Sequence, residues 1–322
     1  MTVYIPSCEC DGAVLRDRGT VLPYLLKVGE TACGGLGGWG VAEKDLGAVE
    51  KALYLLDFFS QGQAQRSLTQ IANASGLSKA TCHRTLQALQ RYGLLEREGE
   101  DYRLGYRLLE LAAHVKAAIE PLSVGNDLME HLRDEVDESV QLVVRSGDEV
   151  VYAEVLPPFS PSRLYVRLGR RAPLYAGASG RLLLAALSDG QIAELLGRVE
   201  LLRYTTRTPQ SREAVMQDVA ATRETWCTRS LGELERYSAE MAVPILGAAG
   251  NVVAALSLAG SDKEYLKPGA RKAMLLALDA TAIGISRRLG YDAAWPTKPE
   301  AFLDACAAMD VEAMPAGADA NV

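Results

Sequence analysis

Between residues 67 and 104, the spacing of hydrophobic positions is first helical and then alternating. Ser67, followed three residues later by Gln70, is typical of a capping box that opens a helix. Gly76 supplies the turn that ends this helix, and Ser78 caps a second helix directly after it. The stretch therefore predicts two short helices joined by a tight turn.

The second of these helices has one apolar stripe and one open face. Cys82, Leu86 and Leu89 stand at i, i+4 and i+7, so they share the buried side. After Gly93, apolar and polar residues alternate around Gly99, which predicts a two-stranded wing. Two helices, a turn and a wing are typical of a module that reads DNA.

The open face of the second helix carries the candidate DNA contacts. Short and hydrogen-bonding side chains near the start of such a helix allow it to enter the major groove. We expect groove contacts from Lys79, Ala80, Thr81, Arg84 and Gln87, and phosphate contacts from Ser67, His83, Arg97 and Arg103. The alternatives are a solvated helix face and, for His83, a plain surface histidine.

Helical patterns flank this module on both sides. Residues 49–59 carry an apolar flank wider than one small module can bury, which indicates a protein partner. Residues 106–119 form another helical pattern, which Pro121 interrupts as in a linker between domains. The sequence thus predicts a winged helix-turn-helix domain over residues 47–105 and a linker helix over residues 106–120.

From Val140 the hydrophobic period changes from helical to extended. Two strands joined by Gly147-Asp148 predict a hairpin, and a third strand is expected over residues 162–169. Helices, two later strands and a long terminal helix follow. This order predicts an α+β domain over residues 121–290, with an antiparallel sheet covered by helices.

Both ends of the chain lack such patterns. We expect residues 1–46 to form a flexible leader, and their formal GxGxxG at Gly35, Gly37 and Gly40 lacks the preceding strand that a dinucleotide site requires. Whether this leader belongs to the natural protein stays open. Residues 291–322 are rich in Ala, Asp and Pro and predict a disordered acidic tail.

The net charge of −7 argues at first against a nucleic-acid partner, because phosphates require Lys and Arg. The charge is unevenly distributed, however: residues 292–322 hold six acids against Lys298 alone, whereas basic side chains gather in the predicted DNA module. The chain has no signal-peptide pattern and no apolar run of the roughly 18 residues that a membrane span needs. We expect a cytoplasmic protein that uses no membrane.

The residues give little support for catalysis, a metal or a cofactor. The six cysteines form no CxxC pair and are expected to be reduced, with Cys8 and Cys10 a weak metal possibility. The sequence GASGR lacks the final glycine of a nucleophile elbow, because Arg181 stands there. No histidine lies in the C-terminal domain beyond its first helix, and Glu233 and Glu235 lack a partner motif. We therefore expect no enzyme and no cofactor.

Over residues 47–290 the chain resembles the IclR family of bacterial transcription regulators. The resemblance is carried by VEKALYLLDFFSQG, SLTQIANASGLSKATCHRTLQALQRYGLLE, RAPLYAGASGRLLLAAL and AVPILGAAGNVVAALSLAG. It implies a winged helix-turn-helix, a linker helix and a GAF-like domain that binds a small organic acid. It also implies homodimers or dimers of dimers on palindromic double-stranded DNA operators.

Within the family, LLRYTTRTPQS and GELERYSAEMAVPI resemble the subgroup that controls catabolism of aromatic acids. The chain departs from that subgroup at Thr225-Trp226-Cys227 and at residues 237–240. An aromatic carboxylate is therefore the first candidate effector, and a small keto acid such as pyruvate or glyoxylate is the second.

The candidate effector site combines a helix start with family positions. The turn Gly177-Ala178-Ser179 opens a helix, and free backbone N–H groups there favour a carboxylate. The resemblance adds the positions of Leu164, Glu240 and Ser257. The alternative for Ser257 is a core serine bonded to the backbone. Glu240 is awkward beside an anion, so it could point outward, pair with an arginine or bind a ligand hydroxyl.

Taken together, these features predict a ligand-switched regulator that binds DNA. In this interpretation, effector binding changes the placement of two winged modules through the linker helix. Whether the regulator represses or activates stays open. The second hypothesis is a small-acid sensor or scaffold module that does not bind DNA.

Overall fold

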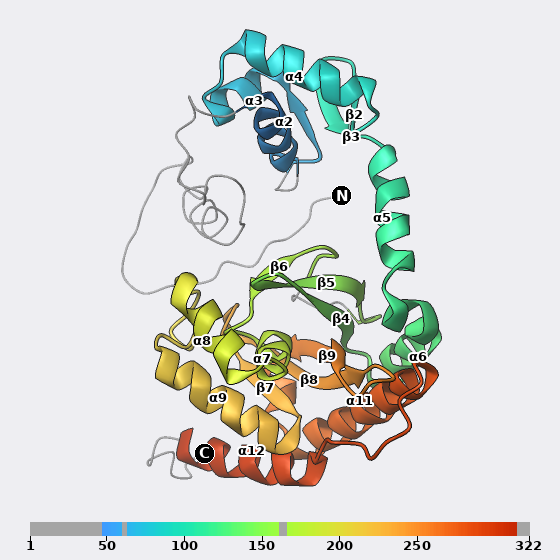
Figure 1. Cartoon of the computed structure of the whole chain (residues 1–322), viewed down its shortest axis with the longest axis vertical. Helices are drawn as coiled ribbons and strands as arrows, with labels where there is room; N and C mark the ends of the chain where they lie inside the picture. The colour runs from blue at the N-terminus through green and yellow to red at the C-terminus, as the bar shows by residue number, and fades with distance from the viewer. Residues whose placement is uncertain (1–46, 60–62, 161–165, 314–322) are drawn as a thin grey trace, which may run out of the picture. The chain divides into compact units, whose positions relative to one another are not determined.

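The computed structural model describes residues 47–59, 63–160 and 166–313 (Figure 1). The chain divides into two compact units, the first ending at Leu86 and the second beginning at Gln87. The division falls inside α4 (Lys79–Arg91), the second helix of the predicted DNA module.

The helices of the DNA module form where the sequence predicts them. They are α2 (Ala48–Asp57), α3 (Leu68–Ser75) and α4, with the short strand β1 (Gln65–Ser67) before α3. The capping box is confirmed: Ser67 Oγ accepts from the Gln70 N–H at 3.2 Å, and Gln70 Oε1 accepts from the Ser67 N–H at 2.8 Å. Gly76 then ends α3 with a left-handed φ of 70°.

The wing is a hairpin of β2 (Leu95–Glu98) and β3 (Asp101–Leu104). Gly99 adopts a φ of 63° at its tip, a conformation that favours glycine. The next helix along the chain, α5 (Arg107–Ala117), contains no buried residue, although its sequence is largely apolar. Pro121 starts α6 (Glu120–Val136), which confirms the predicted interruption between the two helices.

A six-stranded antiparallel sheet forms the centre of the C-terminal domain. Its strand order is β6-β5-β4-β9-β8-β7. The strands are β4 (Ser139–Ser146), β5 (Glu149–Leu156), β6 (Arg171–Pro173), β7 (Thr228–Leu231), β8 (Ser238–Leu246) and β9 (Val252–Ser261). The third strand predicted over residues 162–169 is wrong for residues 166–169, which lack strand structure, and β6 begins only at Arg171; residues 162–165 lie outside the described part of the chain.

Helices cover both faces of this sheet (Figure 1). On one face, α6 and α11 (Pro268–Arg288) bury one hydrophobic cluster, after the short α10 (Asp262–Tyr265). On the other, α7 (Ala178–Ala185), α8 (Asp189–Arg198) and α9 (Arg212–Thr225) bury a second. The predicted α+β architecture with a covered antiparallel sheet is confirmed.

Strand β5 carries a bulge that changes which way its side chains point. Leu142 pairs with Glu154 whereas the next residue, Val143, pairs with Tyr152, so Ala153 has no partner in β4. Tyr152 consequently packs in the cluster under α7. Glu154 instead forms an ion pair with Lys116 of α5, with 2.5 Å between Nζ and Oε2.

The prediction of a disordered acidic tail over residues 291–322 is wrong for α12 (Pro299–Ala313). Phe302 and Cys306 stand one helical turn apart and are buried against the cluster under α11. Asp310 accepts hydrogen bonds from Arg229 Nη2 at 2.9 Å and from Arg271 Nη1 at 2.5 Å. The acidic composition conceals this apolar stripe, because it is only two residues wide. Residues 314–322 lie outside the described part of the chain.

Candidate DNA-reading helix and effector cavity

The first turns of α4 present the predicted DNA contacts on an exposed face. Lys79, Ala80, Arg84 and Gln87 are exposed, whereas Thr81 and His83 are half-buried. The opposite stripe of Cys82, Leu86 and Leu89 is buried, as its spacing predicts. One side of α4 thus holds the helix in place, and the other stays open to a partner.

Local hydrogen bonds cap the start of α4. Ser78 Oγ accepts from the Thr81 N–H at 3.2 Å and lies 2.9 Å from Thr81 Oγ1. The remaining N–H groups of this turn belong to the exposed Lys79 and Ala80. Free N–H groups at an exposed helix start, beside Lys and Arg, favour an anion such as a phosphate.

The wing arginines are already engaged with acids of the wing. Arg103 Nη2 lies 3.0 Å from Glu96 Oε2, and Arg103 Nη1 lies 3.4 Å from Glu98 Oε2. Arg97 Nε donates to the Gly99 carbonyl at 2.9 Å. A phosphate would have to compete with these contacts for the wing arginines.

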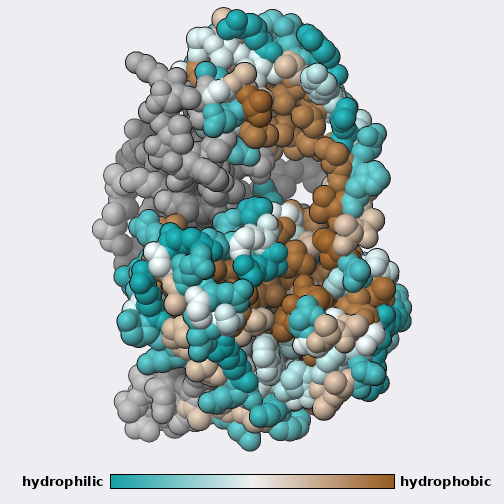
Figure 2. Space-filling view, in the orientation of Figure 1, coloured by the Kyte–Doolittle hydropathy of each residue, from teal (hydrophilic) through white to brown (hydrophobic). Residues whose placement is uncertain are grey.

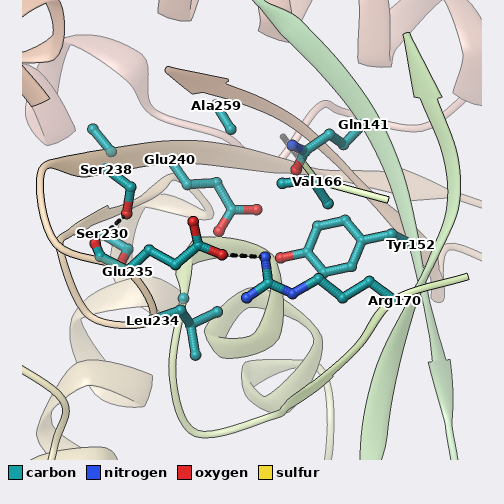
Figure 3. Close-up of a pocket in the computed structure, with 12 residues that line it drawn as sticks. Gln141, Tyr152, Val166, Arg170, Ser230, Leu234, Glu235, Ser238, Glu240 and Ala259 are labelled. Carbon is teal, nitrogen blue, oxygen red and sulfur yellow. Dashed lines mark hydrogen bonds and ion pairs between the residues drawn. The ribbon is translucent and has the colours of Figure 1, made fainter. Parts of the chain in front are cut away.

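In the second unit, a cavity of about 40 Å³ lies between the sheet and α7 (Figure 3). Gln141, Tyr152, Glu240 and Ala259 line it from four strands of the sheet. Its rim is formed by Val166, Arg170 and the loop of residues 232–237 between β7 and β8. The predicted positions Gly177 and Glu240 lie in its wall, whereas Leu164 lies outside the described residues.

The start of α7 is filled by the protein's own carboxylates. The Gly177 N–H donates to Glu233 Oε2 at 3.0 Å, and the Ala178 N–H donates to Glu240 Oε2 at 2.8 Å. The Ser179 hydroxyl donates to Glu240 Oε1. Each donor that the sequence assigns to an effector carboxylate therefore already holds an internal one.

Gly177 is the residue that lets the acids come this close. Its φ is 83°, which lies in the region that favours glycine. A Cβ here would lie 3.0 Å from Leu234 Cδ1 and 3.3 Å from Glu240 Oε2. The glycine therefore serves close packing of the helix start against Glu240, a role that the sequence pattern leaves open.

Glu240 is buried and fixed from several sides. Burial raises the pKa of its carboxyl group, and hydrogen bonds from Ser179 and Ser257 counteract part of that rise. Its side chain does not point outward and forms no ion pair with the described residues, but caps α7 instead, so two of its three alternatives are wrong and a contact with a ligand hydroxyl stays a prediction. Ser257 Oγ donates to Gln141 Oε1 at 3.2 Å, so this serine bonds to a side chain rather than to the backbone.

Glu233 forms a buried ion pair with Arg181, which its sequence context does not predict. Arg181 Nη2 lies 2.5 Å from Glu233 Oε1, and both side chains are about nine-tenths buried. Arg181 Nη1 also donates to the Arg229 carbonyl at 2.8 Å. Breaking such a buried pair by removing one partner destabilises a protein by about 3–5 kcal/mol.

The loop that carries Glu233 and Glu235 is held by two threonines of the RYTTRT run. Thr205 Oγ1 donates to the Gly232 carbonyl at 2.6 Å, and Thr208 Oγ1 donates to the Glu233 carbonyl at 2.6 Å. Both threonines are buried. The run that links the sequence to the aromatic-acid subgroup thus supports one wall of the cavity.

At the rim, Arg170 Nη1 lies 2.5 Å from Glu235 Oε1. Their side chains are 28% and 43% exposed, and a solvent-exposed pair of this kind contributes about 0.2–1 kcal/mol. Arg170 is the only positively charged residue among the described residues that line the cavity. The two acids of one loop therefore differ strongly, because Glu233 is locked inside and Glu235 is held weakly at the surface.

Tyr152 and Gln141 bring further hydrogen-bonding groups to the cavity. The Tyr152 hydroxyl points into the cavity beside Arg170 and makes no hydrogen bond to the other residues drawn in Figure 3. Gln141 is fully buried, and its Nε2 has one long contact, 3.5 Å to Ser139 Oγ. Sequence reasoning missed Arg170, Tyr152 and Gln141, because single residues of loops and strands carry no motif of their own.

Comparison with known proteins decides the family. The model "Bacterial transcriptional regulator IclR C-terminal" matches residues 118–287, and the model "IclR helix-turn-helix domain" matches residues 48–99. The chain belongs to the IclR family. It is therefore a ligand-responsive, DNA-binding transcription regulator of the IclR type, which confirms the resemblance described from the sequence.

Two curated relatives and one solved structure show how far this IclR-family similarity extends. The regulator KipR of Bacillus subtilis is 32% identical over 244 residues, which are 76% of this chain and 97% of KipR. The Pca regulon regulatory protein of Pseudomonas putida is 29% identical over 218 residues, covering 66% of this chain and 73% of that protein. An IclR homologue from Microbacterium hydrocarbonoxydans, complexed with 4-hydroxybenzoate, has a TM-score of 0.66 at 27% identity and covers 76% of this chain and 99% of that one.

Other kinds of site are not found in the described parts of this IclR-family chain. Across residues 47–59, 63–160 and 166–313, no three His, Cys, Asp or Glu side chains are grouped so that they could hold a metal ion. Cys8 and Cys10 lie outside these ranges. No helix in the same ranges is both long and apolar enough to span a bilayer.

Proposed function

We propose that this IclR-type regulator controls a catabolic operon by sensing a small organic acid in the cavity between α7 and the sheet. An aromatic carboxylate is the first candidate and a keto acid such as pyruvate or glyoxylate is the second. The observation that carries this proposal is the cavity itself, whose only charged donor among the described lining residues is Arg170. The 4-hydroxybenzoate complex of the Microbacterium homologue and the name of the Pseudomonas regulator support the choice of acid.

DNA binding is assigned to the exposed face of α4. We infer that Lys79, Ala80, Thr81, Arg84 and Gln87 meet the major groove of a palindromic operator, with Ser67, His83, Arg97 and Arg103 against phosphates. We also propose the division predicted from the sequence: a DNA-binding domain over residues 47–105, a linker over 106–120 and an effector domain beginning at 121. We propose a structural rather than a catalytic role for Glu233 and Glu235, which pair with Arg181 and Arg170.

We also propose a homodimer, or a dimer of dimers, and the exposed apolar surface of α5 supports this proposal. Leu109 and Val115 are 66% and 62% exposed, and Tyr106 precedes them with 65% exposed. Figure 2 shows hydrophobic residues gathered along this helix. An 11-residue helix that buries none of its own residues is stable only when another surface covers its apolar side. A second copy is the occupant that a palindromic operator requires.

A footprint on DNA upstream of the neighbouring catabolic genes tests the proposal. We expect a protected palindrome, an affinity that falls steeply with salt, and a change in affinity when 4-hydroxybenzoate, protocatechuate, pyruvate or glyoxylate is added. Thermal-shift measurements identify the acid, because a ligand at a hundred times its Kd stabilises by about 2.7 kcal/mol. A bound acid without any footprint would favour the sensor or scaffold hypothesis instead.

A further inference from the structure

We propose that Glu235 is a built-in competitor for the effector's carboxylate, and that an acid effector binds by taking Glu235's place on Arg170. This inference rests on the proposed function, because it assigns the contact by which the same cavity holds its acid. It also moves the carboxylate away from the helix start, where the sequence places it.

The start of α7 is a poor place for an incoming carboxylate in this chain. The N–H groups of Gly177 and Ala178 and the hydroxyl of Ser179 are bonded to the buried Glu233 and Glu240. An effector there would have to displace a buried carboxylate or bind beside it. Displacement leaves a buried carboxylate without its partners, and binding beside it brings two negative charges together, so both are strongly unfavourable.

The rim offers a much easier exchange. Glu235 is 43% exposed, so its carboxylate passes into water when it leaves Arg170. The backbone of Arg170 stays in place, because its carbonyl accepts from the Tyr152 N–H at 3.0 Å and the neighbouring Gly169 N–H donates to the Tyr152 carbonyl at 2.8 Å. One carboxylate replaces another on the same guanidinium, so the number of ion pairs is conserved.

The cavity is too small for an effector unless part of its wall moves. A volume of about 40 Å³ is well below the roughly 150 Å³ of a cavity that holds benzene. The loop of residues 232–237 is the wall that must move, because it carries Glu235 and the half-buried Leu234 over the rim. Release of the Glu235 side chain from Arg170 opens this side of the rim, while Thr205 Oγ1 still holds the loop at the Gly232 carbonyl and Ser238 Oγ still holds it at the Glu235 carbonyl.

The opposite end of the cavity selects the rest of the ligand. The Tyr152 hydroxyl and Gln141 Nε2 are buried donors that lack a strong partner among the described residues. Buried donors of this kind favour an oxygen atom on the ligand, and they penalise a ligand without one. The geometry therefore fits a small carboxylate that carries a hydroxyl or keto oxygen away from its carboxyl group.

Isothermal titration of the full-length protein tests the exchange, with 4-hydroxybenzoate, protocatechuate, pyruvate and glyoxylate as probes. For the acid that binds the wild type, we expect Arg170→Gln to lower affinity at least about tenfold and Glu235→Gln to raise it about two- to fivefold. The amide 4-hydroxybenzamide, which lacks the charge, serves as the uncharged control. Circular dichroism checks that each variant is folded.

A further variant locates the carboxylate. Ser179→Ala alters the helix start without changing a residue that lines the cavity, and it should leave acid affinity within about threefold of wild type if Arg170 is the anchor. Normal binding by Arg170→Gln, with loss of binding in Ser179→Ala, would overturn the inference while acid sensing stands. Unchanged affinity in Glu235→Gln would also overturn it. Failure of all four acids to bind the wild type would instead contradict the proposed function.

Discussion

Two helices in this protein have similar sequences at their first turn, but one of these turns is exposed and the other is buried. Both α4 and α7 have small residues in their first turn, Ala80-Thr81 and Ala178-Ser179-Gly180, and the N–H groups of such a turn favour an anion. At α4, Lys79 and Ala80 are exposed, and only the local Ser78 caps the helix. At α7 every residue from Ala178 to Ala185 is buried, and acids from a distant part of the chain cap the helix.

The difference shows that burial decides what satisfies a helix start. Buried N–H groups must find partners inside the protein, because no water reaches them. Exposed N–H groups keep water until a better acceptor arrives. A start such as that of α4 is therefore available to an external anion, whereas a start such as that of α7 serves the fold.

Removal of Glu233 tests the buried side of this comparison and has the largest expected effect. Glu233→Ala leaves Arg181 buried without its main partner, so we expect the free energy of unfolding in urea to fall by about 3–5 kcal/mol. Glu235→Ala, two residues later on the same loop, is the matched control and should change stability by less than about 1 kcal/mol. Equal effects of the two substitutions would mean that burial does not separate these acids.

Removal of Arg84 tests the exposed side. Arg84→Ala should weaken operator binding by about 1–3 kcal/mol, measured by band shift at fixed salt. Arg103→Ala is the control within the same module, and we expect a smaller loss, since Arg103 is already paired with Glu96 and Glu98. A larger loss in Arg103→Ala would place the main contact in the wing.

The local cap of α4 gives the smallest expected effect. Ser78→Ala removes the acceptor for the Thr81 N–H and should cost about 1 kcal/mol. Amide hydrogen exchange in the first turn of α4 should then be about fivefold faster, because 1.4 kcal/mol corresponds to a factor of ten. Ser78→Thr keeps the cap and should exchange as the wild type does. No acceleration in Ser78→Ala would mean that Ser78 does not hold this turn.

Local chemistry made the DNA module predictable from the sequence. The capping box of Ser67 and Gln70, the turn at Gly76 and the stripe from Cys82 to Leu89 all act within a few residues. Short-range hydrogen bonds and helical spacing therefore determine this part of the fold, and a single sequence contains both.

The cavity was predictable only in part, because its decisive contacts join distant residues. The sequence indicates Gly177 at the start of α7 and, through family resemblance, Glu240, and both residues line the cavity. It assigns no role to Glu233 and Glu235, whose partners Arg181 and Arg170 lie more than 50 residues earlier. No local pattern signals an ion pair of that range. Arg181, which directly follows a glycine-rich turn in the sequence, was the clue to an internal acid.

Composition misled the prediction at the C-terminal end. Ala and Asp dominate residues 291–322, and such a composition is typical of disorder. In α12, however, Asp310 forms ion pairs with two buried arginines, Arg229 and Arg271. An acid that is surplus in a count of charges becomes a structural counter-ion once its partners are known.

The bulge in β5 has a consequence for how a binding event travels. In a regular strand, residues two apart share a face, so Tyr152 and Glu154 would both look into the cavity. The extra residue at Ala153 turns them to opposite faces, with Tyr152 at the effector cavity and Glu154 on Lys116 of α5. Strand β5 thus connects a residue that lines the effector cavity with a residue that contacts α5. We expect a ligand that tilts Tyr152 to be felt at the helix that leads back toward the DNA-reading module.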